Sequence, residues 1–206
     1  LQCPLIGVNH VEAHPYAIVL KHGEMPFPIM HLIVAGGHTL LIHARDHFDN
    51  KIIGRSVDDA AGECVDKVAK MYGHPMPGGP VVDRAAMKFS GKDFDFPRPL
   101  MHKNAHNFSF SGLKTAMLRF REKSLKTSSK SAKSSLLLQE EGPILASFFQ
   151  SVVDVLLHKT FNAAETYGLK NISVSGGLAA SRKLHSEFEK ESAKRGITLF
   201  YPPPNL

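Results

Sequence analysis

The residues whose types and spacing most directly indicate chemistry are two histidines, His10 and His14, four positions apart. On a helix this spacing places both imidazoles on one face about one turn apart, where they can reach one metal ion such as zinc or iron. Glu12, the acid between them, would point away from that face, which argues against the zinc motif of metalloproteases, whose glutamate directly follows the first histidine. The residues alone leave two interpretations equally open, a metal site and two polar residues at a helix start.

Two glycine pairs, Gly36-Gly37 and Gly176-Gly177, each follow an apolar run that is typical of a strand. Glycine at such a turn lets backbone N–H groups approach an anion without an intervening side chain. Together the two turns suggest a phosphate held between two lobes, although a single glycine pair after a strand is more often only a tight turn. The sequence contains neither a Walker A lysine loop nor a GxGxxG turn, which disfavours the common phosphate-loop and Rossmann classes.

Acidic residues precede and enter the helix expected after residue 58. Asp58 and Asp59 are expected to cap that helix and to complement its dipole. Asp66 lies one turn further on, where its carboxylate could accept hydrogen bonds from ribose hydroxyls. An exposed surface charge is the alternative interpretation of Asp66.

The elements that must position these residues alternate between strands and helices, which predicts an α/β fold. The runs at 29–34 and 39–44 are expected to form a β-hairpin around the glycine turn at 35–38. Further strands are expected at 51–56, 172–175 and 197–201, and helices from the 58–63 segment to Gly73, from Pro80 onward, and at 112–121, 144–167 and 181–195, with a loop at 93–107.

Composition limits the class of protein. The chain has 206 residues, of which 43% are hydrophobic, enough for one large domain or two small ones. Two cysteines are too few for a disulfide framework, and no apolar run approaches the length of a membrane span, so neither secretion nor a membrane is expected. A net charge of +6 favours an acidic partner such as nucleic acid.

The segment 123–133 alternates Ser, Thr and Lys with little apolar content. Such a segment cannot bury a face, so we expect a mobile loop or linker. Its lysines, together with Arg119 and Arg121, could contact the phosphates of an RNA backbone, whereas a solvated loop is the more common case.

Six motifs, in order along the chain, closely resemble those of the tRNA N6-adenosine threonylcarbamoyltransferase family (TsaD/Kae/Qri), formerly known as O-sialoglycoprotein endopeptidase. They are His10-Val11-Glu12-Ala13-His14 and the segments 34–39, 58–67, 77–80, 108–115 and 175–177. The resemblance implies an actin-like, sugar-kinase-like (ASKHA) α/β fold of two lobes with a nucleotide cleft, here truncated. Residues 1–110 would form the rest of the N-terminal lobe and its central helical region, and 111–206 the helical part and the start of the C-terminal lobe.

The resemblance also implies an activity and a set of site residues. The family transfers the threonylcarbamoyl group from threonylcarbamoyl-adenylate to N6 of the adenosine next to the anticodon in tRNAs that read ANN codons. By position, His10 and His14 match two ligands of an iron or zinc ion, while ATP or threonylcarbamoyl-adenylate, with magnesium accompanying the nucleotide, would be the ligand. The substrate positions are Ile33, Val34, Ala35, Gly36, Gly37, Asp66, Gly79, Asp83 and Ser181. No general base is identified.

Three departures from the family pattern stand out. Ala35 replaces a serine of the first glycine turn, and Ser181 replaces an asparagine after the second, which shortens or removes a hydrogen bond to the nucleotide. The family's first phosphate hairpin and the motif supplying the metal's aspartate ligand are not in this sequence, so we expect a fragment that is a poor enzyme alone.

The resemblance implies tRNA and partner subunits as binding partners. These would be an actin-like paralogue and a small ATPase in bacteria, or a kinase-containing complex elsewhere, in the cytoplasm and without a membrane. The alternative function is a non-catalytic, actin-like nucleotide-binding scaffold of the same pathway. Retention of His10 and His14 argues against the scaffold.

Overall fold

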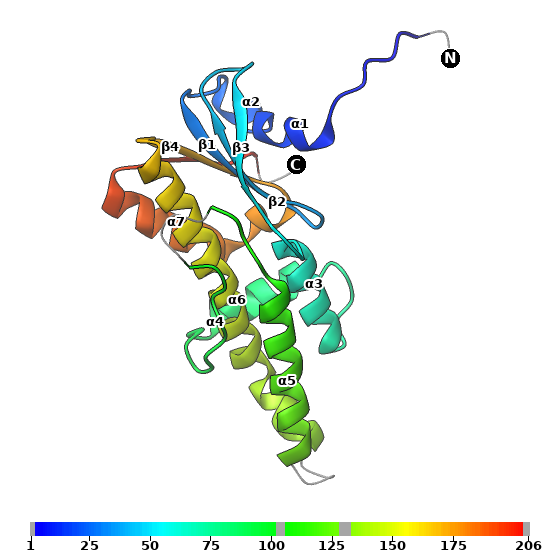
Figure 1. The fold of residues 1–206 in the computed structure, drawn as a ribbon. Coiled ribbons are helices and arrows are strands. Elements are labelled where there is room, and N and C mark those ends of the chain that lie inside the picture. Colours follow the sequence, from blue (N-terminus) through cyan, green and yellow to red (C-terminus); the bar gives the residue numbers. More distant parts are fainter. Residues whose placement is uncertain (1–2, 102–105, 128–132, 204–206) are drawn as a thin grey trace.

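The computed structural model describes residues 3–101, 106–127 and 133–203, and its strands form one five-stranded sheet (Figure 1). The strands are β1 (Ile29–Val34), β2 (Thr39–Ala44), β3 (Asn50–Arg55), β4 (Asn171–Ser175) and β5 (Thr198–Phe200). Their order is β3-β2-β1-β4-β5. β1, β2 and β3 pair antiparallel, whereas β4 runs parallel to both β1 and β5. The expected hairpin is confirmed, with Val34 opposite Thr39.

The positions of β1 and β3 in the sheet explain their compositions. β1 lies at the centre and is buried along its whole length, which its apolar sequence on both faces permits. β3 lies at one edge and exposes Lys51 and Arg55, as edge strands commonly do to prevent pairing with other chains. The sheet therefore combines a local antiparallel hairpin with parallel strands from the end of the chain.

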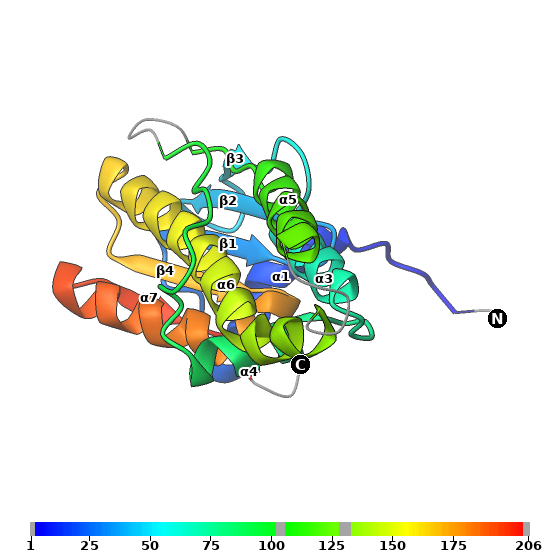
Figure 2. The same cartoon turned by 90° about the horizontal axis from the view of Figure 1, so that it is seen from below.

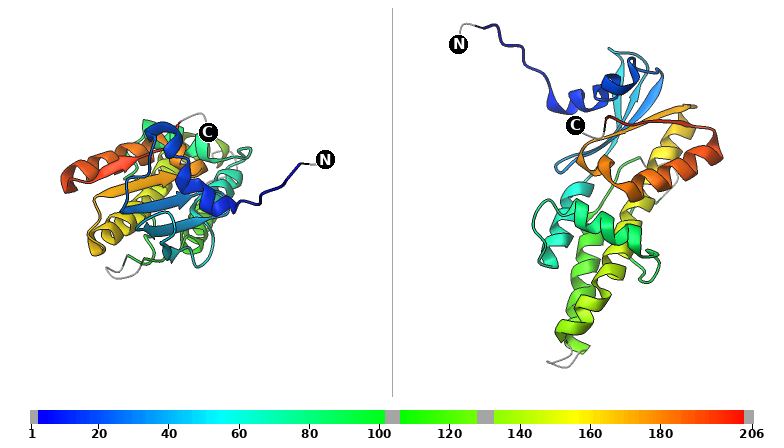
Figure 3. Two further views of the ribbon diagram at one scale, coloured as in Figure 1. Left: turned by 90° about the horizontal axis from the view of Figure 1, so that it is seen from above. Right: turned by 180° about the vertical axis from the view of Figure 1, so that it is seen from behind.

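Helices cover both faces of the sheet. They are α1 (His10–Tyr16), α2 (Val19–His22), α3 (Ala61–Met71), α4 (Gly79–Lys88), α5 (Ser111–Thr127), α6 (Lys133–Thr166) and α7 (Arg182–Arg195), with a short 3₁₀ helix, η1 (Gly177–Ala180). α1 and α2 lie over one face, and α6 and α7 over the other (Figures 2 and 3). α5 runs beside α6, and the two project together away from the sheet (Figure 1).

The prediction of a loop at 123–133 is wrong for the part of this segment that the structure describes. Residues 123–127 continue α5 and Lys133 begins α6, while 128–132 lie outside the described residues. The buried side chains of Leu113 and Met117 anchor α5 at helical spacing. Lys and Ser are compatible with a helix, so the polar residues that follow extend an already nucleated helix.

The longest helix, α6, forms the centre of the main core. Its segment Glu140–Thr166 is long and apolar enough to cross a membrane, but 78% of its apolar window is buried inside the molecule. Phe148, Phe149 and Val152 are fully buried there and pack in the same cluster as Leu32 of β1. The apolar residues of α6 are thus used for internal packing. Strands from both sides of residue 110 share this sheet, and the division into two lobes stays a prediction.

Candidate functional site

The two glycine turns lie side by side because the strands before them are parallel neighbours. Ile33 near the end of β1 is opposite Ser175 at the end of β4. Gly176 has a φ of +96°, and a Cβ on it would lie 2.6 Å from the carbonyl oxygen of Val34. Only glycine allows this close approach. In open α/β sheets, ligands bind outside the carboxyl ends of the strands, where these two turns meet.

The first turn offers its backbone to a ligand. Ile33 and Val34 are fully buried, so the residues of the turn that follow them are the ones a ligand can reach. The Ala35 N–H donates to the carbonyl of His38 at 2.8 Å, which closes the turn. Gly36 and Gly37 are exposed, and a Cβ on either would meet nothing within 4 Å. Open space therefore lies in front of the two glycines.

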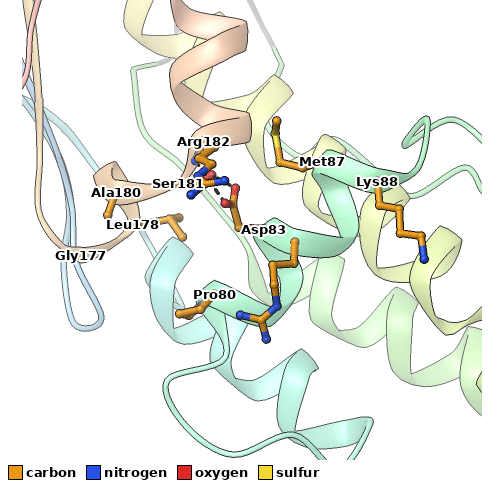
Figure 4. A pocket seen from close by; sticks show the side chains of 11 residues that line it. Pro80, Asp83, Met87, Lys88, Gly177, Leu178, Ala180, Ser181 and Arg182 are labelled. Carbon is orange, nitrogen blue, oxygen red and sulfur yellow. Dashed lines mark hydrogen bonds between the residues drawn. The ribbon is translucent and has the colours of Figure 1, made fainter. Parts of the chain in front are cut away.

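A cavity of about 510 Å³ lies between α4 and the segment from η1 to the start of α7 (Figure 4). Gly79 and Asp83 line it from α4, and Gly177 and Ser181 from the other wall. The structure thus brings three of the sequence-predicted nucleotide positions, Gly79, Asp83 and Ser181, to one cavity beside the second glycine turn.

Asp83 ties the two walls of the cavity together. One oxygen of its carboxylate accepts from the Ser181 hydroxyl at 2.5 Å and from the Lys183 N–H at 3.0 Å, and the other accepts from the Arg182 N–H at 3.2 Å. Ser181 is also the N-cap of α7, since its hydroxyl accepts from the Leu184 N–H at 3.1 Å. The negative charge of Asp83 therefore faces the positive end of the α7 dipole.

Asp66 is not among the residues that line the cavity. Its carboxylate accepts from the Gly78 N–H at 2.7 Å and holds the turn that leads into α4. A Cβ on Gly78 would lie 2.3 Å from the Cβ of Ala69, so α3 packs directly against this turn. Asp66 thereby fixes the position of Gly79 at the start of the cavity.

The histidine pair lies on α1, as the spacing predicts. Asn9 caps this helix by accepting from the N–H groups of Val11 and Glu12. The ring centroids of His10 and His14 are 4.6 Å apart. Nε2 of His14 is buried and has no hydrogen-bond partner in the structure.

The surroundings of His14 favour its neutral form. Burial, and then the neighbouring His10 and His38, lower its pKa below the usual value. A neutral imidazole retains a lone pair for a metal ion, and the unpartnered Nε2 of His14 is compatible with that role. Within the described residues no three His, Cys, Asp or Glu side chains form a group that could hold a metal. The electrostatic effect of His38 on His14 indicates that the first glycine turn lies near the pair.

Asp58 caps a different helix from the one expected. Its carboxylate accepts from the Phe110 N–H at 2.8 Å, from the Ser109 hydroxyl at 2.6 Å, and from both the N–H and the hydroxyl of Ser111, all at the start of α5. Burial raises the pKa of Asp58, but these hydrogen bonds lower it by more. The expected cap of α3 is therefore wrong. The Thr39 hydroxyl accepts from the first N–H of α3 instead.

Asp59 also belongs to this junction, because its carboxylate pairs with Lys114 of α5 and Lys67 of α3. Two sequence motifs that are about 50 residues apart thus form one network of hydrogen bonds and ion pairs. Their complementary acids, hydroxyls and lysine were visible in the sequence, but no local pattern paired them.

Sequence reasoning did not single out three basic residues of the cavity, Arg84, Lys88 and Arg182. The available signal was the spacing of Arg84 and Lys88 from Gly79, which places all of them on α4.

Comparisons with solved structures show the fold. The chain is similar to T. kodakarensis HypF with a TM-score of 0.65 and 12% identity, covering 97% of this chain and 34% of that one. It is also similar to component A of (R)-2-hydroxyglutaryl-CoA dehydratase from Acidaminococcus fermentans, with a TM-score of 0.50 and 14% identity, covering 93% of this chain and 61% of that one. Both have actin-like folds, which confirms the expected fold class.

Curated relatives extend the likeness to the sequence. The tRNA N6-adenosine threonylcarbamoyltransferase of Syntrophotalea carbinolica is 43% identical over 206 residues, covering 100% of this chain and 58% of the relative. The protein of the same name from Thermotoga neapolitana is 39% identical over 208 residues, covering 100% of this chain and 59% of the relative. The chain therefore spans somewhat more than half the length of these relatives. The family model described as tRNA N6-adenosine threonylcarbamoyltransferase matches residues 1–206, and the chain belongs to that family.

Proposed function

We propose that the complete protein transfers the threonylcarbamoyl group from threonylcarbamoyl-adenylate to N6 of the adenosine next to the anticodon, in tRNAs that read ANN codons. The observation that carries this proposal is the meeting of two glycine turns beside a cavity lined by Gly79, Asp83 and Ser181, in a chain of this family. A nucleotide in the cavity would direct its phosphate toward those turns.

The chain's residues would orient the adenylate and stabilise negative charge. The N6 amine attacks the carbamoyl carbonyl carbon, a new C–N bond forms, the bond from that carbon to the phosphate oxygen breaks, N6 loses a proton, and AMP leaves. Backbone N–H groups of Gly36, Gly37 and Gly177 would donate to the oxygens on which this charge develops. Asp83 and Asp66 hold the walls in position and leave the cavity free for the ligand.

We further propose that His10 and His14 are two ligands of an iron or zinc ion. Their ring separation and the unpartnered, buried Nε2 of His14 support this assignment. When bound, such an ion would polarise the carbamoyl carbonyl or neutralise phosphate charge. Magnesium is proposed to accompany ATP.

The partners proposed are tRNA and the subunits implied by the family. These are an actin-like paralogue and a small ATPase, or a kinase-containing complex, with the cytoplasm as the site of action. The basic character of the chain, with a net charge of +6, is compatible with an RNA substrate.

The test combines the complete protein with its partner subunits, ATP, threonine, bicarbonate and unmodified tRNA. We expect threonylcarbamoyladenosine in the digested tRNA, and a large loss of both product and bound metal in the His10→Ala, His14→Ala variant. A His22→Ala, His158→Ala variant removes two other histidines and should retain both product formation and bound metal. Normal product and metal content in the first variant would refute the metal assignment, and absence of product from the wild type would refute the transfer.

A further inference from the structure

The cavity between α4 and α7 is surrounded by an excess of positive charge. Arg84, Lys88 and Arg182 line it and are exposed, and we call these three side chains the rim cations. Asp83 is the only acid among the described residues that line this cavity. Its carboxylate already accepts three hydrogen bonds at the start of α7. The charge of the rim cations is therefore available to a ligand.

In the part of the chain that the structure describes, Arg182 differs from the other basic side chains of α7 in its lack of an acidic partner. Arg182 is in no ion pair among the described residues. The remaining lysines and arginine of α7 each pair with a glutamate, as Lys183–Glu187, Lys190–Glu187, Lys194–Glu191 and Arg195–Glu191. Arg182 is thus the cation of α7 that lies at the cavity and is left unneutralised.

The two rim cations on the opposite wall, Arg84 and Lys88, also have no ion pair with an acid among the described residues. Within the described part of the chain, Arg84 has no ion pair, and Lys88 contacts the ring of Phe89 with its ammonium 5.5 Å from the centroid. These two residues are four positions apart on α4, so they lie on one face about 6 Å apart along the helix axis. Arg182 begins α7 on the other wall (Figure 4). The three cations therefore line the cavity from two helices.

The number of cations indicates what kind of anion fits. Glycine turns at the inner end can hold one phosphate through backbone N–H groups. Three exposed cations exceed what the single phosphate of an adenylate needs, and magnesium would already neutralise part of the charge of ATP. Long exposed side chains can also reach a ligand that extends out of the cavity. A polynucleotide backbone, with one negative charge per nucleotide, has this chemistry.

We propose that the rim cations bind successive backbone phosphates of the RNA substrate at the opening of the cavity. This proposal rests on the proposed function, because it assumes that the RNA acceptor approaches the nucleotide in this cavity. The contacts are to phosphates, so they position the RNA without reading its sequence.

The test measures RNA binding by the full chain as a function of salt. The variant Arg84→Gln, Lys88→Gln, Arg182→Gln should bind an unmodified tRNA transcript at least about tenfold more weakly, by fluorescence anisotropy. The slope of log affinity against log salt concentration should become shallower by about 3, one for each lost phosphate contact. Affinity for AMP and ATP, measured by calorimetry, should change less than about twofold, because the glycine turns are intact.

A matched control removes the same charge elsewhere. The variant Lys21→Gln, Lys51→Gln, Lys170→Gln neutralises three exposed lysines outside the cavity and should change the salt slope by less than about 1. An equal change in both variants would overturn the proposal, since net charge would then explain the effect. Unchanged RNA binding with weakened AMP or ATP binding would overturn it by assigning the cations to the nucleotide.

The outcome is separable from that of the proposed function. If the rim variant binds RNA as tightly as the wild type while the complete protein forms threonylcarbamoyladenosine, the rim proposal fails and the transfer stands. If the complete protein forms no product although RNA binding depends on the rim cations, the transfer fails. Undetectable RNA binding by the wild-type chain would overturn the rim proposal directly.

Discussion

His31 illustrates how burial changes the chemistry of a single residue. It lies on β1, is 2% exposed, and its Nδ1 is 2.6 Å from the Ser173 hydroxyl oxygen. Burial lowers the pKa of His31 from its usual value of 6.5 to about 4. Between these two values the unfolded chain binds a proton that the folded chain does not, so stability should fall as the pH drops below 6.5.

The expected loss between pH 6.5 and pH 5 is about 1.5 kcal/mol, because the slope approaches about 1.4 kcal/mol per pH unit only below the unfolded pKa. It is measured by urea unfolding of the wild type at both pH values, together with NMR titration of the His31 ring. The variant His31→Gln, which cannot be protonated there, should lose less stability over the same interval. A His31 ring that titrates near 6.5, or a variant with the same pH dependence as the wild type, would contradict the prediction.

At the scale of elements, the contact between the two glycine turns depends on one residue. Gly176→Ala should destabilise the chain by at least about 2 kcal/mol, because its φ of +96° is strained for alanine and the new Cβ would meet the Val34 carbonyl at 2.6 Å. Gly177→Ala is the matched control, since a Cβ there meets nothing within 4 Å. Thermal unfolding of the two variants should separate them clearly, and equal losses would mean that the turns do not pack together.

Local patterns in the sequence predicted elements but not how distant elements join. The β1–β2 hairpin was predictable because both strands and their glycine turn are adjacent in the sequence. The parallel pairing of β1 with β4 joins residues that are 142 positions apart, such as His31 and Ser173, and no periodicity encodes it. For the same reason the local pattern favours the nearest helix for Asp58, although its hydrogen-bond donors lie about 50 residues further on.

The candidate site also has parts that local sequence patterns predict and parts that depend on distant elements. The glycine turns and the histidine spacing are local, and the sequence indicated both. The cavity needs two helices from different parts of the chain, so its basic opening became visible only when Arg84 and Arg182 were brought to one place.

At the scale of the whole molecule, one core joins the early strands to the late helices. Phe149 of α6 is fully buried in this core, whereas Phe48, in the loop between β2 and β3, is 99% exposed. The two residues have identical side chains in opposite environments. They therefore separate the contribution of core packing from that of the phenyl ring itself.

Phe149→Ala should lower the free energy of unfolding by about 3 to 5 kcal/mol, because it removes buried contacts and leaves a cavity that the surrounding helices fill only in part. Phe48→Ala should stay within about 0.5 kcal/mol of the wild type. Urea unfolding followed by circular dichroism measures both. Because the apolar window of α6 is 78% buried, the loss at Phe149 should appear in the chain alone, without lipid or partner. A neutral Phe149→Ala would show instead that α6 contributes little to the core of the free chain.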